Sequence, residues 1–398
     1  MPKVLLILNR FIIGGPALQV TNLAHYMGFD YEIRLVVGNK NDHEKSAELW
    51  AQNFGIDLHY VSEMSRNISP LYDYLSYLKI KKIIQDFKPD IVHTHGAKSG
   101  AIGRMAAASM KVPVIIHTFH GHVFHSYFGK IKTNIFLKIE RFLAKKTDAL
   151  VAISQQQKQE LCNHFKIAGP EKFRVIPLGL DLQKFQDHYA DKRKAFRSEF
   201  GLPDQTIAIG IIGRLAPIKN HRLFLKAIAF LLKNSDHKIK AFIVGDGEMR
   251  SHLEIQASDL SISFSEIADP TNNSTLVFTS WRNDIDTVNA GLDIVCLTSL
   301  NEGTPISLIE AQASNKPIIS TRVGGIVDIV EENQTGLLSN INDTILFMNN
   351  LLMIVNDEVL RKKLGRSSFD SVKLKFGYDQ LVQNTGSLYK EVLSRKTN

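Results

Sequence analysis

The 398-residue sequence has few cysteines and no long apolar run. Its two cysteines, Cys162 and Cys296, are far apart, which excludes a disulfide framework or a CxxC metal pair and favours a reducing cytoplasm. Since no run reaches about 18 apolar residues and the N-terminus enters the short run Val4–Leu8 directly, we expect neither a membrane span nor a signal peptide. Its 12 prolines and 25 glycines exclude a collagen-like chain. We expect a globular protein.

Positive charge is concentrated in the first half of the chain. Lys and Arg number 48 against 40 Asp and Glu. Residues 1–195 hold 27 of these cations and 17 of the acids, whereas residues 196–398 hold 21 and 23. The whole excess therefore belongs to the first half. Nucleic acid is not the expected partner, because exposed aromatic residues do not alternate with the cations.

Short apolar runs alternate with segments of helical spacing along the whole chain, a pattern that predicts parallel sheets covered by helices on both faces. The runs in the first half are Val4–Leu8, Leu35–Val37, Ile91–His95, Val114–Thr118, Ala149–Ile153 and Val175–Leu178. Those in the second half are Ile207–Ile212, Ala241–Val244, Leu276–Thr279, Ile294–Leu297, Pro317–Ser320 and Gly336–Leu338.

The pattern predicts an α/β protein with two doubly wound, Rossmann-like domains. The first covers residues 1–185 and the second residues 206–378, and the polar segment 186–205 is expected to link them. A last helix, residues 379–398, follows all the predicted strands and fits on either domain. Because open α/β sheets bind ligands at the carboxyl ends of their strands, each strand-to-helix loop is a candidate site.

Two loops of the first domain carry candidate residues. Gly14 and Gly15 precede a helix, where paired glycines let a ligand approach the backbone; a plain tight turn is the alternative. The loop is not GxGxxG, which argues against a dinucleotide oxidoreductase. Four histidines, His117, His120, His122 and His125, follow a later strand. No nearby acid or cysteine completes a zinc site, so we favour loop and core histidines, with His120 as the one that contacts substrate.

In the second domain, Arg214 and Lys219 lie between a strand and a helix. Two cations beside a helix N-terminus form a good anion site, and an exposed basic turn is the alternative. Farther along, Glu302, Gly303 and Thr304 follow another strand and precede a helix. The amides of this loop are available to an anion. Glu310 lies inside that helix, where a buried carboxylate needs a polar partner such as a pair of ligand hydroxyls, unless it lies on a solvated face.

Two further patterns are weaker. Gly245 and Gly247 follow a strand as in a phosphate loop, but a third glycine is missing and a turn that starts a helix is the plainer interpretation; Gly245 is kept as a donor-binding candidate. Asp284 and Asp286 form a DxD pattern, which holds a metal in some nucleotide-sugar enzymes. We expect Asp284 to cap a helix instead.

Together these residues resemble those of the retaining GT-B glycosyltransferases of family 4. The spacing of Glu302 and Glu310 matches the family's E-x7-E signature, and Arg214 with Lys219 matches its G-R-x-x-x-x-K diphosphate clamp. The resemblance implies that Glu302 binds the hydroxyls of the donor sugar and Glu310 the ribose. His120 matches the position of the family's active-site histidine.

The resemblance extends to three other segments. Gly14 and Gly15 match the glycine loop of the acceptor domain, and Val277–Trp281 resembles the strand and loop around the nucleobase, where Ser280 and Trp281 replace the usual glycine. The last helix is implied to cross back to the first domain.

The implied reaction is transfer of a sugar from a nucleoside diphosphate sugar, UDP favoured over GDP, to an acceptor hydroxyl with retained configuration. Arg214, Lys219 and the amides near Gly303 and Thr304 would stabilise the departing diphosphate, so no metal or other cofactor is expected. A phosphate oxygen of the donor is described as assisting deprotonation of the acceptor.

The excess positive charge then suggests a lipid-linked or cell-envelope acceptor and a peripheral enzyme on the cytoplasmic face of an anionic membrane. The basic stretches are Lys79–Ile84 and Lys130–Lys146, and a solvated basic face is the alternative. A GT-B nucleotide-sugar epimerase and a non-catalytic nucleotide- or carbohydrate-binding protein are the competing functions.

Overall fold

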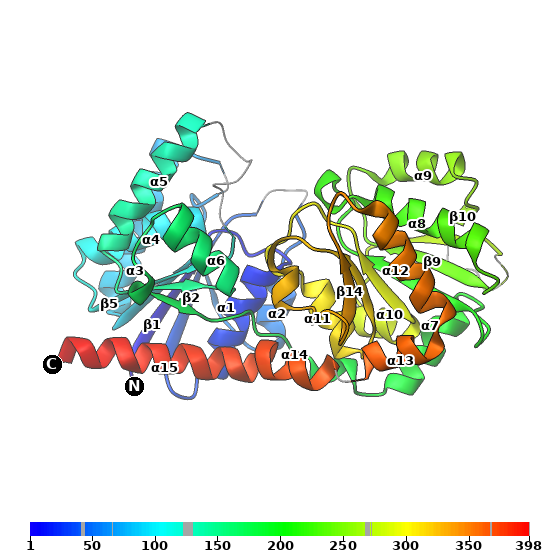
Figure 1. Cartoon of the computed structure of the whole chain (residues 1–398). Helices are drawn as coiled ribbons and strands as arrows, with labels where there is room; N and C mark the ends of the chain where they lie inside the picture. Colours follow the sequence, from blue (N-terminus) through cyan, green and yellow to red (C-terminus); the bar gives the residue numbers. More distant parts are fainter. Residues whose placement is uncertain are drawn as a thin grey trace. The chain divides into compact units, whose positions relative to one another are not determined.

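The computed structural model describes residues 1–40, 44–65, 67–121, 130–266, 271, 273–366 and 368–397, with side chains omitted at 130–132, 368 and 397. The chain divides into two compact units, Met1–Leu180 with Phe376–Asn398, and Asp181–Lys375. Each unit is built on a parallel sheet (Figure 1). Among the described residues, no helix combines the length and the apolar character needed to cross a bilayer.

The first unit contains a parallel sheet of strand order β3-β2-β1-β4-β5-β6-β7. Its strands are β1 (Lys3–Leu8), β2 (Glu32–Gly38), β3 (Leu58–Val61), β4 (Ile91–His95), β5 (Val114–Phe119), β6 (Ala149–Ala152) and β7 (Phe173–Val175). Its helices are α1 (Gly15–Tyr26), α2 (Glu48–Asn53), α3 (Pro70–Phe87), α4 (Ala97–Ser109), α5 (Lys130–Lys145), α6 (Gln155–Gln159) and α15 (Tyr378–Thr397). The central strands are buried on both faces, which explains their continuous apolar runs.

Two groups of helices cover the two faces of this sheet. Helices α3 and α4 bury Ile80, Ile84 and Ile102 against one face. Helices α1, α2 and α15 pack on the other. The last helix is thus part of the first unit: Leu388 lies in its core, and Figure 1 shows α15 running beside this sheet.

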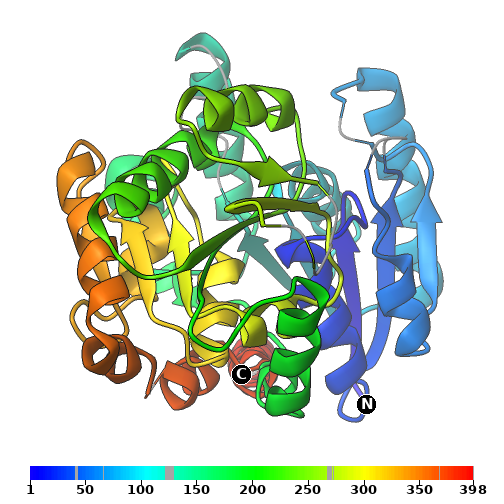
Figure 2. The same ribbon diagram turned by 90° about the vertical axis from the view of Figure 1, so that its right-hand side faces the viewer.

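The second unit has the strand order β10-β11-β9-β8-β12-β13-β14, again parallel. Its strands are β8 (Ile207–Ile212), β9 (Ile239–Val244), β10 (Phe264–Ser265), β11 (Leu276–Ser280), β12 (Ile294–Leu297), β13 (Ile318–Thr321) and β14 (Gly336–Ser339). Its helices are α7 (Tyr189–Glu199), α8 (His221–Asn234), α9 (Arg250–Asp259), α10 (Ile285–Gly291), α11 (Ile306–Ala313), α12 (Thr344–Asn356), α13 (Glu358–Gly365) and α14 (Ser368–Phe376), which ends at the unit boundary. Helices α8 and α12 share one core with the sheet (Figure 2).

Short helical turns complete the elements of both units. The 3-10 turns are Pro170–Lys172, Gln183–Phe185, Pro217–Lys219 and Gly324–Asp328, and a π-type turn covers Glu160–His164.

The segment 186–205 is not a linker, contrary to the sequence-based expectation. Most of it forms α7, which belongs to the second unit, and the division between the units falls at Leu180 and Asp181. Phe196 is fully buried and packs against the backbone of Gly291 at the end of α10. The helix has a polar sequence because its contacts are made by Tyr189, Phe196 and long cationic side chains.

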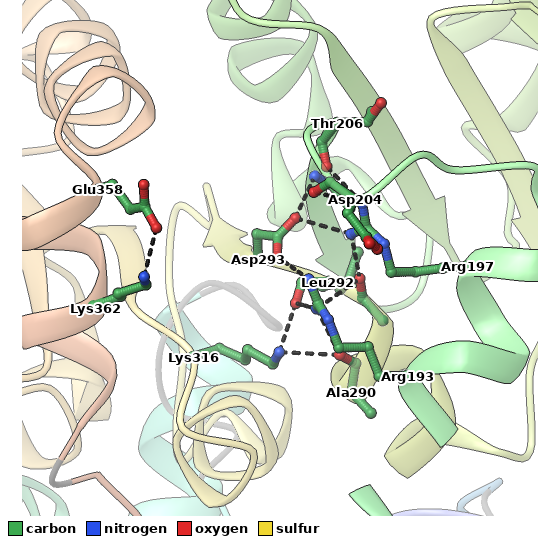
Figure 3. A network of polar contacts seen from close by, with 12 residues as sticks. Arg193, Arg197, Asp204, Thr206, Ala290, Leu292, Asp293, Lys316, Glu358 and Lys362 are labelled. Carbon is green, nitrogen blue, oxygen red and sulfur yellow. Dashed lines mark hydrogen bonds and ion pairs between the residues drawn. The ribbon is translucent and has the colours of Figure 1, made fainter. Parts of the chain in front are cut away.

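Those cations form a network at the C-terminal end of α10 (Figure 3). Asp293 accepts hydrogen bonds from Arg193 Nη2 at 2.8 Å and Arg197 Nη1 at 3.2 Å. Lys316 Nζ donates to the carbonyls of Ala290 at 3.1 Å and Leu292 at 2.6 Å. Positive charge at a helix C-terminus is stabilising, so the network fastens α7 to the sheet.

Three smaller expectations also differ. The last predicted strand of the first unit is β7 and ends at Val175, and the short edge strands β3 and β10 were not expected. Asp284 does occupy the N-cap of α10, but its carboxylate makes no cap hydrogen bond and instead accepts from Arg282 Nε at 2.8 Å. The Asp284 carboxylate therefore pairs with the Arg282 guanidinium instead of capping the helix.

Candidate functional site

The predicted diphosphate-binding segments of the second unit follow β8 and β12, which are neighbouring parallel strands. The carboxyl ends of such strands meet at one edge of the sheet. The Leu300 amide donates to the Ile218 carbonyl at 2.8 Å, and Thr298 Oγ1 donates to the Lys219 carbonyl at 2.9 Å. The two loops are therefore in direct contact.

Lys219 and Glu302 form an ion pair across these loops. Lys219 Nζ lies 2.5 Å from Glu302 Oε1, and Ser299 Oγ donates to the same oxygen at 2.5 Å. The Glu302 side chain is 10% exposed, so Lys219 and Ser299 replace much of the water that would otherwise solvate it. A cation and a carboxylate are thus held side by side, partly open to solvent.

Arg214 is the second cation at this edge. It follows Gly213 at the end of β8 and is exposed. Within the described part of the chain, its guanidinium makes no hydrogen bond or ion pair. Its five donors are therefore available to an anion, and a guanidinium fits phosphate oxygens in pairs.

The N-terminus of α11 faces the same edge. Gly303 has open space where a side chain would begin, and Pro305 at the N-cap supplies no capping side chain. The hydroxyl of Thr304 is buried, and no partner for it is found among the described residues. The first amides of a helix lack internal partners, so this end offers hydrogen-bond donors and a positive dipole to an anion.

Glu310 lies one turn farther along α11 and is half-buried. Burial raises the pKa of its carboxyl to about 7; the Lys184 cation opposes this rise and the Asp286 carboxylate adds to it. Asp286 itself pairs with Lys192 at 2.8 Å. No hydrogen bond of the Glu310 carboxyl is found in the described ranges. Glu310 is thus a half-buried acid whose carboxyl has no hydrogen-bond donor among the described residues.

The loop after β9 touches the loops after β8 and β11. Gly245 has φ +134°, and a Cβ there would lie 2.1 Å from the Gly213 carbonyl oxygen, so only glycine fits. Its amide donates to the Ser280 carbonyl at 2.9 Å. Ser280 adopts φ +56°, a conformation that favours glycine, and donates from Oγ to Asp246 Oδ2 at 2.7 Å. Trp281 follows and is 49% exposed.

The first unit gathers histidines at the carboxyl ends of β4 and β5. His95 Nδ1 and His120 Nε2 are 3.0 Å apart, and the His93 and His95 rings lie 4.2 Å apart, centre to centre. His93 also bonds to Tyr389 on α15 and to Thr118, each at 2.7 Å. The expected His120 is therefore part of a chain of imidazoles.

These imidazoles are neutral at pH 7. Burial lowers the pKa of His93 and of His120 to about 3, and it lowers the pKa values of His95 and His117 well below 6.5. His95 Nε2 and His120 Nδ1 are buried, and no partner for either is found in the described segments. Their role is to donate or accept hydrogen bonds rather than to carry charge.

Two other expectations concern the same unit. His122 and His125 lie outside the described residues, and in the described ranges no group of three or more His, Cys, Asp or Glu is arranged around a metal. Gly14 and Gly15 lie at the start of α1, where the Gly14 carbonyl accepts from the Leu18 amide at 3.1 Å.

Comparisons with known proteins identify the family. Residues 192–370 match the model "Glycosyl transferases group 1", and residues 13–184 match "Glycosyltransferase Family 4". The UDP-Gal:alpha-D-GlcNAc-diphosphoundecaprenol alpha-1,3-galactosyltransferase of Escherichia coli is 33% identical over 338 residues, which are 85% of this chain and 84% of that protein. This chain is a family 4 glycosyltransferase.

More distant proteins agree with this assignment. The capsular polysaccharide biosynthesis glycosyltransferase CapM of Staphylococcus aureus is 26% identical to this glycosyltransferase over 343 residues, covering 85% of this chain and 86% of CapM. HepE from Anabaena, solved with UDP and glucose, superposes with a TM-score of 0.80 at 19% identity and covers 98% of this chain and 100% of its own. The predicted GT-B fold, with its two Rossmann-like units, is confirmed.

The glycosyltransferase has two site elements that the sequence analysis missed. Ser299 supplies the second partner of Glu302, and the paired glycines Gly324 and Gly325 follow β13. At Gly324, φ is +52° and a Cβ would lie 1.8 Å from the Glu302 carbonyl oxygen; the Gly325 amide donates to that oxygen at 3.1 Å. These glycines hold the Glu302 loop in place. The signal was visible as two glycines just after a predicted strand.

Proposed function

We propose that this glycosyltransferase transfers a sugar from a UDP-sugar to a hydroxyl of a lipid-linked glycan, with retention of anomeric configuration. The name of the E. coli relative supports both the UDP-sugar and the lipid-linked diphosphate acceptor. The complex of HepE with UDP supports the same nucleotide. A GDP-sugar is the less favoured donor.

The observation that carries the proposal is the Lys219–Glu302 pair beside Arg214 and the open N-terminus of α11. When the sugar leaves, negative charge grows on the diphosphate. Two cations and the helix amides are preorganised donors for that charge, which is the usual source of catalysis in such reactions. We propose that this charge is stabilised without a metal ion, and that activity persists in EDTA.

Two carboxylates have proposed roles on the donor. Glu302 is held by Lys219 and Ser299 and retains free lone pairs for the sugar hydroxyls. Glu310 lacks a donor, and two ribose hydroxyls would satisfy it. Trp281, next to the Gly245 loop, offers an exposed ring on which a base can stack.

His120 is the proposed catalytic residue of the first unit, and Gly14 with Gly15 the proposed acceptor loop. The neutral His120 ring, with Nε2 bonded to His95 and Nδ1 buried, can exchange a hydrogen bond with a sugar hydroxyl. Since no residue is proposed as a covalent nucleophile, we propose the front-face route, in which a donor phosphate oxygen takes the acceptor proton.

The donor assignment is tested by calorimetric titration with UDP, GDP and ADP. We expect UDP to bind most tightly and Lys219→Ala to weaken it by about 10- to 150-fold, the value of a charge-assisted hydrogen bond of about 1.5–3 kcal/mol. Lys226→Ala is the matched control, since Lys226 is an exposed cation on α8, the helix that follows the turn containing Lys219. Equal UDP affinity in the wild type and Lys219→Ala would refute the clamp.

The competing functions give different products. An epimerase converts the free nucleotide sugar into an isomer without an acceptor, and a binding protein releases no UDP. Release of UDP that depends on an added lipid-linked sugar supports transfer, and either of the other results contradicts it.

A further inference from the structure

Three helices of the first unit lie side by side and form one outer surface. Helix α4 contacts α3 on one side and α5 on the other (Figure 1). Their inner residues enter the cores beneath, such as Ile84 of α3 and Leu143 of α5. Their outer residues define what we call the α3–α5 face.

The α3–α5 face exposes many large apolar side chains. On α5, Ile135, Ile139 and Phe142 recur at helical spacing, and Ile139 and Phe142 are 41% and 49% exposed. The remaining exposed members are Leu71, Tyr72, Tyr74, Leu75 and Leu78 on α3 and Met105 on α4. Scattered exposed apolar residues are ordinary, whereas exposed apolar residues that recur along one side of a helix, as on α5, are typical of an interaction surface.

The stretch of sequence that contains this face carries mostly positive charge. Residues 70–146 contain 13 Lys and Arg against four Asp and Glu. Asp73 is paired with Lys98 at 2.5 Å, and the buried Glu140 is paired with Arg104 at 2.7 Å. Two of the four acids are thus engaged in ion pairs, and Asp86 on α3 is the exposed acid of this stretch.

Cations, in contrast, remain beside the apolar residues. Lys82, Lys138 and Lys145 are exposed, and Lys146 Nζ lies 5.1 Å from the centre of the Phe142 ring. Long cationic side chains next to apolar ones suit the headgroup layer, where the chain carbons contact lipid and the charge meets phosphate.

We infer that the α3–α5 face docks onto an anionic bilayer and inserts Ile135, Ile139 and Phe142 at the boundary between headgroups and acyl chains. This inference rests on the proposed function, because a lipid-linked acceptor is presented at a bilayer surface. Insertion of these three side chains contributes to membrane binding independently of charge. Helices α3 and α5 begin at the carboxyl ends of the strands, at the same edge of this unit as His120 and Gly14.

The test is flotation of the full-length protein with phosphatidylcholine vesicles that contain or lack phosphatidylglycerol, at low and high salt, with no donor or acceptor. We expect binding to the anionic vesicles. Ile139→Gln with Phe142→Gln should lower the partition coefficient by about tenfold at both salt concentrations. Lys138→Gln with Lys145→Gln should lower it mainly at low salt.

The matched control is Ile255→Gln with Val359→Gln, since these exposed residues lie on α9 and α13 of the second unit. This control should bind vesicles as the wild type does. All variants should retain wild-type thermal unfolding, which shows that the first unit is folded, and wild-type UDP affinity, which shows that the second unit is folded.

Other outcomes overturn the inference. Absence of wild-type binding at low salt, or unchanged binding by the Ile139 and Phe142 variant, refutes the apolar contact. A dimer that this variant dissociates identifies a second copy as the occupant instead. UDP binding is measured separately, so failure on vesicles leaves the donor assignment intact.

Discussion

Replacing Glu310 by Gln should stabilise the free protein and weaken nucleotide binding at the same time. Burial raises the pKa of this carboxyl from 4.5 to about 7. The folded state therefore keeps a proton that the unfolded state loses, and the free energy of unfolding falls as pH rises from about 4.5 to 7. At about 1.4 kcal/mol per pKa unit, the loss is up to about 3 kcal/mol above pH 7. Gln escapes it.

Urea unfolding at pH 8 and pH 4 measures this effect. The protein has two tryptophans, so Trp50→Phe leaves Trp281 as a fluorescent reporter of the second unit. In that background, Glu310→Gln should be more stable than its parent at pH 8, with no difference at pH 4. Glu248→Gln, at an exposed carboxylate of the same unit, should show neither change.

For UDP affinity we expect the opposite ranking, with the variant weaker than its parent. If the ribose hydroxyls donate to Glu310, its variant loses about 10- to 150-fold in UDP affinity at pH 8, the value of about 1.5–3 kcal/mol for hydrogen bonds to a charged group. A variant that is less stable than its parent at pH 8, or that binds UDP equally well, would refute the assigned role.

Three further substitutions test individual site residues. Gly324→Ala should destabilise the protein by more than about 1 kcal/mol and raise the donor KM, because its Cβ would overlap the Glu302 carbonyl at a left-handed φ; urea unfolding and initial rates check both. Trp281→Ala should cost about 1–3 kcal/mol of UDP binding by calorimetry, whereas Trp281→Phe retains most of it; equal loss in both would contradict stacking. His95→Leu, which leaves His120 Nε2 unpaired, should lower kcat by about tenfold with donor KM unchanged. A change confined to KM would exclude that positioning role.

The strands were the most predictable part of the fold. Parallel strands buried on both faces have continuous apolar runs, and β8 matches its predicted range. Edge strand β3 was missed because its sequence, Leu58–Val61, includes His59 and Tyr60 at partly exposed positions. Helix α7 was missed for another reason: its Arg193 and Arg197 make long-range bonds to the end of α10, which periodicity does not reveal.

For the candidate site, the positions of residues at strand ends were predictable, whereas the contacts between loops were not. Arg214, Lys219 and Glu302 follow strand ends at characteristic spacing. The contact of Gly324 with the Glu302 loop depends on β13 lying beside β12, and the pairing of His95 with His120 depends on β4 lying beside β5. Contacts of this kind depend on the order of strands in the sheet, which cannot be read from a single sequence.

The most direct measurement is transfer of radiolabelled sugar from a UDP-sugar to an undecaprenyl-diphosphate-linked sugar, comparing the wild type with Glu302→Gln. Glu302 lies between Lys219 and Ser299 in the proposed donor site, so the amide should retain the fold and lose at least about 100-fold in kcat. Label in the lipid product with the wild type, and its near absence with the variant at unchanged thermal stability, is the expected result. Equal transfer by both proteins, or no transfer by the wild type from any UDP-sugar, would contradict the proposed chemistry.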